Sequence, residues 1–287
     1  MSNPEPTICI NVDVSNPGQF FACCGLFELA DRLWPGAEGW FEGQSFCLLT
    51  DDRTKTLSDL LAEARDMTFP VGDEAEDDEE ESDDNNDDLP VEPIELRWKD
   101  TKQAILLDWW AEKSIKPWAG SMKERPILRA MLRAIDSGHC TPFDDLRAAF
   151  DPPKLSTPSD DGKKPRATKP KKREPFYFDP RRGNKSHPLD SGFSPDTHEM
   201  QSECCPALEA LCFIGLQRAR PAPTGTPNQS RYTVWTKHIP ANLVGAVVCG
   251  IVPLPGSINY VFTNYFRTDQ RKHKTFSQAT LERSNHV

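Results

Sequence analysis

The segment Thr7–Trp34 constrains the fold more than any other part of the chain, because the signals of a strand and a helix follow each other directly in it. Apolar side chains occupy every second position of Thr7–Val14, the period of a strand with one buried face. Asn16 and Pro17 then form a helix start, in which the Asn16 amide oxygen accepts a backbone N–H. Gln19 is placed to reach back, as in a capping box. The sequence therefore predicts a strand joined to an apolar helix at the centre of the first domain.

The order of elements over residues 7–98 predicts a ferredoxin-like domain. After the first strand and helix, two strand-like runs flank a turn at Glu42 and Gly43. A short amphipathic helix then covers Thr54–Arg65, and a strand covers Pro93–Trp98. Strand, helix, strand, strand, helix, strand is the βαββαβ order of the ferredoxin-like fold.

Composition divides the chain into two predicted α+β parts. Residues 151–173 contain eight basic and three acidic residues among many Pro, Ser and Thr, so we expect a basic flexible linker. The ferredoxin-like domain with a helical extension then occupies residues 1–150, and a second α+β part occupies residues 174–287. The apolar spacing in the extension predicts helices over 126–135 and 143–150.

An acidic run dominates the charge of the whole chain. Between Asp73 and Asp88 there are twelve carboxylates and no basic residue. Such a run has too little apolar surface to offset the entropy of ordering, so we expect a disordered acidic loop over 71–90. Without these carboxylates the net charge changes from −10 to +2. A nucleic-acid partner is therefore not excluded, since local patches set the field that a polyanion feels.

The sequence lacks the signals of several protein classes. No apolar run reaches the ~18 residues of a membrane span, and no signal peptide is visible, so we expect a cytoplasmic protein without membrane contact. The nine cysteines include no C-x-x-C pair, which favours reduced thiols without disulfides or metal. Phosphate-loop, dinucleotide-binding, zinc-protease and serine-hydrolase motifs are also missing. We therefore predict no catalytic residue and no cofactor.

Three basic clusters are the candidate functional sites. Each combines guanidinium or ammonium groups with a nearby glycine or aromatic ring, which suits contact with phosphates and stacking of bases. Taken singly, each cluster is more commonly a solvated charged face. The predicted nucleic-acid-binding residues are Lys116, Trp118, Lys123, Arg181, Arg182, Lys185, Arg267, Arg271, Lys272 and Lys274.

Five segments of the chain together resemble a family of CRISPR-associated proteins of subtype I-U, also called I-G. The segments are Asn16–Ala30, Leu107–Trp110, Lys116–Gly120, Tyr265–Thr268 and Lys274–Phe276. Members are subunits of type I RNA-guided surveillance complexes, known as Cascade. The similarity fits either a large-subunit-like protein or a RAMP-type backbone subunit, and the element order of residues 7–98 favours the second.

This resemblance implies a non-catalytic subunit in antiviral defence that contacts the guide RNA, the target DNA or both. Its partners would be the other effector subunits, the CRISPR RNA, the target DNA and a recruited helicase-nuclease that performs cleavage. In RNA-guided complexes base pairing reads the sequence, while the protein holds the backbone. Two other classes stay open at this point: a protein–protein scaffold without nucleic-acid contact, and a hydrolase with a Cys or His at its centre.

Overall fold

Two helices without a polar face lie at the centre of the fold, α1 (Pro17–Leu33) and α5 (Pro206–Arg218). Every residue of α1 up to Ala30 and every residue of α5 up to Leu216 is buried. A helix that is buried on all sides needs neighbours on all sides, and sheets and loops supply them here. The computed structural model describes residues 3–70, 91–99, 103–118, 122–151, 171–183, 203–267 and 273–282.

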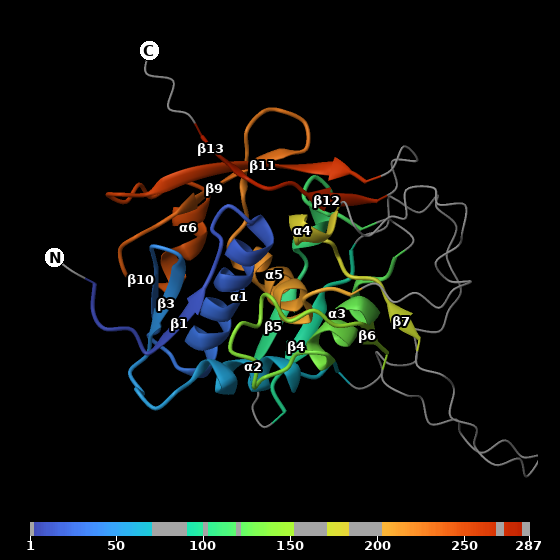
Figure 1. Ribbon diagram of the computed structural model, residues 1–287, viewed down its shortest axis with the longest axis horizontal. Coiled ribbons are helices and arrows are strands. Elements are labelled where there is room, and N and C mark those ends of the chain that lie inside the picture. Colours follow the sequence, from blue (N-terminus) through green and yellow to red (C-terminus); the bar gives the residue numbers. More distant parts are fainter. Residues whose placement is uncertain are drawn as a thin grey trace, which may run out of the picture.

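Two antiparallel sheets flank this helix pair, as Figure 1 shows. The first has the strand order β1, β3, β2, β10 and the second the order β12, β11, β9, β8, with β13 also paired to β11. The first sheet contains β1 (Ile8–Asn11), β2 (Glu38–Glu42), β3 (Ser45–Leu49) and β10 (Ile239–Pro240). The second contains β8 (Ala222–Pro223), β9 (Gln229–Val234), β11 (Ile258–Phe266), β12 (Lys274–Phe276) and β13 (Thr280–Leu281).

Short elements complete the described fold. Two further strand pairs are β4 (Ile94–Arg97) with β5 (Ala104–Leu107) and β6 (Ala149–Phe150) with β7 (Lys172–Arg173). The remaining helices are α2 (Leu57–Arg65), α3 (Glu124–Arg133), α4 (Pro180–Gly183), α6 (Val244–Val248) and the 3-10 turns Trp109–Ala111 and Ala241–Leu243. No helix in the described part of the chain is long and apolar enough to cross a membrane.

The predicted strand–helix unit is confirmed, with one change at its cap. The Asn16 side chain accepts the backbone N–H of Gln19 at 3.2 Å, as expected of an N-cap. The Gln19 side chain, however, accepts the N–H of Asp13 at 2.7 Å instead of the N-cap N–H. Gln19 therefore ties the helix start to the end of the preceding strand.

The mixed α+β class is confirmed, but the ferredoxin-like arrangement is not. In that fold β4 would lie beside β1, whereas here β4 pairs with β5 and the register joins Ile94 to Leu107. The apolar run Ala104–Leu107 offers β4 a partner close by in sequence. The first sheet gains its fourth strand from the second half, where Ile239 of β10 lies opposite Gly39 of β2.

The helical extension is confirmed in α3 but not over 143–150. There the chain forms turns, and it ends in the two-residue strand β6. A single cluster of buried side chains includes residues from both sides of the predicted linker. The acidic segment 71–90 and residues 152–170 of the linker lie outside the described residues. Disorder of the acidic loop and flexibility of the linker stay predictions.

The contact between α1 and α5 is close because glycines face each other across it. A Cβ on Gly25 would lie 2.0 Å from the carbonyl oxygen of Leu211 and 3.2 Å from the nitrogen of Gly215. A Cβ on Gly215 would lie 2.0 Å from the carbonyl oxygen of Phe21. Any side chain here would push two backbones apart. An ion pair closes the far end, since Arg218 Nε lies 2.5 Å from Oε2 of the buried Glu28.

We expect Gly25→Ala to destabilise the protein by about 2 kcal/mol or more, because the added methyl group overpacks a rigid helix contact. Denaturant unfolding measures this, with Gly138→Ala as the control. A Cβ on Gly138 meets only Asp136 Oδ1 at 3.5 Å, and we expect a change within about 0.5 kcal/mol. Equal stability of the two variants would contradict the close packing of α1 on α5.

Candidate nucleic-acid interface

The strand β12 gathers segments that are far apart in the sequence. The backbone N–H of Lys274 donates to the carbonyl of Pro117 at 2.8 Å. On the neighbouring strand, Asn264 Nδ2 donates to the carbonyls of Ser114 and Lys116 at 3.1 and 3.2 Å. The carbonyls of loop 114–118 are therefore anchored to β11 by the Asn264 side chain and to β12 by the Lys274 backbone, so two of the predicted basic clusters are neighbours.

The segment before α4 packs against β12 as well. Thr275 Oγ1 donates to the carbonyl of Tyr177 at 3.0 Å, and the rings of Phe178 and Phe276 are 5.4 Å apart. Tyr177 has φ 67°, in the left-handed region that an aromatic residue seldom adopts. Strained backbone of this kind persists where its surroundings hold it and is concentrated at functional sites. Helix α4, which carries the third basic cluster, also contacts β12.

Three cations in this region each lie over an aromatic ring. Lys116 Nζ is 5.1 Å from the ring centroid of Trp118, and Lys274 Nζ is 5.0 Å from that of Phe266. Arg267 Cζ is 3.5 Å from the ring centroid of Tyr177. Such cation–aromatic contacts orient long basic side chains. We call this group the β12 strip, and its members are Lys116, Tyr177, Phe266, Arg267 and Lys274.

The charges of the strip are not equally compensated. Lys116 Nζ lies 3.0 Å from Glu124 Oε1, so a carboxylate already faces that ammonium. Lys274 Nζ donates to the neutral Asn228 Oδ1 at 3.2 Å and forms no ion pair within the described residues. Burial lowers the pKa of Lys274, which means that its ammonium has lost hydration without gaining a counter-charge. An anion at this position would stabilise the charged form.

Trp118 has a different place from the one predicted. Its side chain is buried, and its ring contacts Trp109, Phe176 and Phe213 in the aromatic core. Its Nε1 donates to Glu124 Oε1 at 2.8 Å. A ring enclosed in this way cannot stack on a base. Trp118 instead packs against the Lys116 ammonium. Phe266, which is 38% exposed, is the ring of the strip that solvent reaches most.

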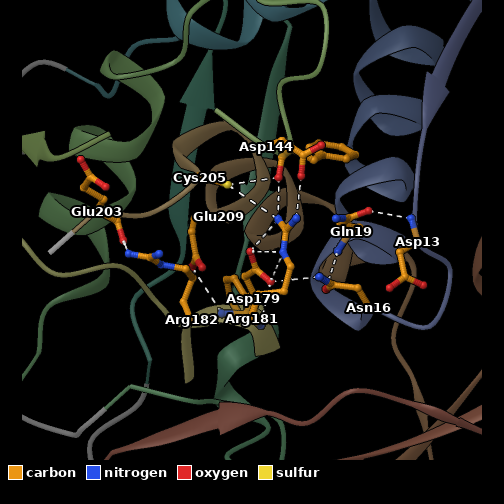
Figure 2. Close-up of polar contacts among 12 residues, drawn as sticks. Asp13, Asn16, Gln19, Asp144, Asp179, Arg181, Arg182, Glu203, Cys205 and Glu209 are labelled. Carbon is orange, nitrogen blue, oxygen red and sulfur yellow. Dashed lines mark hydrogen bonds and ion pairs between the residues drawn. The ribbon is translucent and has the colours of Figure 1, made fainter. Parts of the chain in front are cut away.

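Arg181 is held by carboxylates, as Figure 2 shows. Its Nη2 lies 2.8 Å from Oδ2 of the fully buried Asp179, and its Nη1 lies 2.6 Å from Asp144 Oδ1. Nη2 also donates to the Phe143 carbonyl at 2.6 Å. The charge of Arg181 is therefore already compensated by carboxylates of the protein itself. Arg182 donates to the carbonyl of Glu203.

Of the other predicted residues, only Lys123 is described by the structure. Lys123 is exposed at the N-cap of α3. Lys185, Arg271 and Lys272 lie outside the described residues. The structure thus brings Lys116, Arg267 and Lys274 together on the β12 strip, and it leaves the exposed Arg181 paired with carboxylates beside the strip.

Three polar side chains are buried beside Arg181, those of Asn16, Asp179 and Glu209 (Figure 2). Asn16 Nδ2 donates to Asp179 Oδ1 at 2.9 Å, which joins the start of α1 to the start of α4. Glu209 of α5 is fully buried, and its Oε2 accepts the N–H of Phe178 at 3.4 Å. Its Oε1 has no hydrogen-bond partner among the residues that the structure describes. Burial, and then the negative charge of Asp179, raise the pKa of Glu209 to about 8.

Sequence reasoning found the cap role of Asn16 but not its bond to Asp179, and it missed Glu209. A usable signal was present, because Glu209 is the single carboxylate in the apolar run Pro206–Leu216. Buried carboxylates are uncommon unless they are paired or protonated. In the described residues, no group of three or more His, Cys, Asp or Glu side chains is arranged to hold a metal ion.

Comparison with known proteins yields no relative. No protein-family model matches the chain, and neither a curated protein nor a solved structure gives a match.

The pH dependence of stability tests the state of Glu209. Its pKa is about 8 in the folded protein, against an ordinary value of 4.5, so the folded state binds more protons between these values. Stability from this group is therefore full below about pH 4.5 and falls as pH rises, by at most about 1.4 kcal/mol per pH unit. We therefore measure the free energy of unfolding of Glu209→Gln and of the unmodified protein at pH 5 and pH 8 by denaturant unfolding. We expect the difference between them to shift in favour of the variant as the pH rises, because only the unmodified protein loses stability from this group.

The exposed Glu63 on α2 provides the control, because Glu63→Gln should give the same stability difference at both pH values. A difference for Glu209→Gln that does not change with pH would mean that the Glu209 carboxyl is ionised throughout this range.

Proposed function

We propose that this chain is a non-catalytic subunit of a type I CRISPR surveillance complex and binds the backbone of guide RNA or target DNA through the β12 strip. The observation that carries the proposal is the convergence of Lys116, Arg267 and Lys274 on one strand pair. These residues come from segments about 150 positions apart in the chain. Cations that share a surface with aromatic rings suit a sugar–phosphate backbone and its bases.

Lys274 supports the proposal most directly. A desolvated ammonium without a counter-ion in the described chain gains most from a phosphate, since the cost of removing it from water is already part of the folded state. Phe266 next to it offers an exposed ring face for a base or sugar. Contacts of this type do not read sequence, so base pairing with the guide would supply the specificity.

Under this proposal the chain works in the cytoplasm with the other effector subunits, the CRISPR RNA and the target DNA. It performs no bond cleavage itself, which would belong to the recruited helicase-nuclease. The ferredoxin-like backbone role is not favoured by the sheet order, because β4 pairs with β5 and not with β1.

The dependence of binding on salt tests the proposal. We expect Lys274→Ala, and less strongly Lys116→Ala, to reduce the slope of log affinity against log salt by about 0.7–0.9 for each lost phosphate contact. The measurement is fluorescence anisotropy with labelled single-stranded RNA and DNA, for the purified chain and for the reconstituted complex. Matched and mismatched targets should lose affinity equally, because the lost contacts are to the backbone.

Lys55→Ala is the matched control. Lys55 Nζ also lies over an aromatic ring, 5.7 Å from the centroid of Trp34, but on the side of the molecule that carries α2. Its loss should leave the slope unchanged. Equal slopes for Lys274→Ala, Lys116→Ala and Lys55→Ala, with the complex intact, would overturn the nucleic-acid proposal and favour the scaffold.

A further inference from the structure

Two cysteines lie opposite each other on neighbouring strands of the first sheet. The register of β1 and β3 pairs Cys9 with Cys47. The N–H of Val12 donates to the carbonyl of Gln44, so Val12 and Ile10 belong to hydrogen-bonded pairs and Cys9 does not. In a non-hydrogen-bonded antiparallel pair the Cα atoms are about 4.5 Å apart, which is within the range that a disulfide spans.

The two sulfur atoms are already in contact. Cys9 Sγ and Cys47 Sγ are 2.9 Å apart, and both are free thiols. Cys9 is exposed, whereas Cys47 is buried. A reagent in solution can therefore reach one sulfur, and the second sulfur is held next to it. Neighbouring thiols with this asymmetry are the arrangement of a reactive cysteine and its resolving partner.

We propose that Cys9 and Cys47 form a redox-reversible cross-link that closes when the protein meets a peroxide. The Cys9 thiolate attacks one oxygen of hydrogen peroxide, the O–O bond breaks, and Cys9 becomes a sulfenic acid as one water leaves. The sulfur of Cys47 then attacks the sulfur of Cys9, the S–O bond breaks, and a second water leaves. Two thiols are oxidised by two electrons and one peroxide is reduced to two waters. A dithiol reductant reverses the bond by exchange.

The order of these steps follows from the surroundings of the thiols. Burial, with the contact to Cys9 and the charge of Glu42, raises the pKa of Cys47 to about 12, so this thiol is protonated at neutral pH. Because thiolates are the nucleophiles, Cys47 reacts poorly with a reagent from solution. It reacts in the second step because the sulfur of Cys9 is held against it, at a high effective concentration.

A disulfide between Cys9 and Cys47 would fix an edge strand of the first sheet. Among the described residues β1 pairs with β3 alone, so β1 is an edge strand held on one side. A Cys9–Cys47 bond fixes β1 in register and encloses residues 10–46, which include α1. Closing a loop of this length restricts the unfolded chain. Spacing in the sequence gave no hint of a disulfide, since the partners meet only through the register of the sheet.

Peptide mapping tests the proposal on the full chain. The protein is treated with hydrogen peroxide, free thiols are alkylated, and the product is digested with trypsin and Asp-N. Cleavage before Asp13 separates Cys9 from Cys23 and Cys24. We expect one cross-linked species that joins the Cys9 peptide to the Cys47 peptide, lighter by two hydrogens and absent after reduction. The oxidised protein should melt about 4–10 °C higher than the reduced protein.

Cys9→Ser should lose both the cross-linked peptide and the gain in melting temperature, and it should fold normally because the position is exposed. Cys140→Ser, which removes another exposed thiol, should keep both. Recovery of Cys9 as an uncoupled sulfinic acid, with Cys47 open to alkylation after unfolding, would overturn the proposal. Coupling of Cys9 to any other cysteine would overturn it as well.

Discussion

The fold depends on the close approach of α1 and α5. Gly25 and Gly215 let the two backbones meet without intervening side chains, and both helices are buried on every side as a result. Because α1 belongs to the first half of the chain and α5 to the second, neither half covers its own central helix. The two sheets then pack around the pair, and β10 completes the first sheet from the second half. The close helix contact thus makes the two halves one packing unit.

The same constraint positions the candidate interface. Asn16 caps α1 and also holds Asp179 at the start of α4, so the segment 176–179 is fixed against the helix pair. In that segment the ring of Tyr177 lies against the guanidinium of Arg267, and the carbonyl of Tyr177 accepts a hydrogen bond from the hydroxyl of Thr275. The β12 strip is therefore built on buried structure, although its cations reach the surface. The buried carboxyl of Glu209 lies beneath this junction, and its raised pKa lets it remain protonated there near neutral pH.

Local signals in the sequence predicted most of the large elements, and these held where short-range chemistry decides. The capped helix after Asn16 and the hairpin around Gly43 are examples. Sheet order could not be predicted. β4 pairs with β5, and nothing in the sequence of either strand shows which partner it will take. Trp118 and Arg181 were predicted to contact nucleic acid, but core packing around Trp118 and the carboxylate partners of Arg181 depend on the tertiary fold.

We propose that loop 114–118, segment 174–178 and strand β12 form one nucleic-acid surface. Hydrogen–deuterium exchange with and without single-stranded RNA tests it most directly, because it reports each segment separately. We predict that RNA slows exchange in all three segments together and leaves α2 and the β2–β3 hairpin unchanged. Protection confined to other parts of the chain, or no protection at saturating RNA, would contradict the claim.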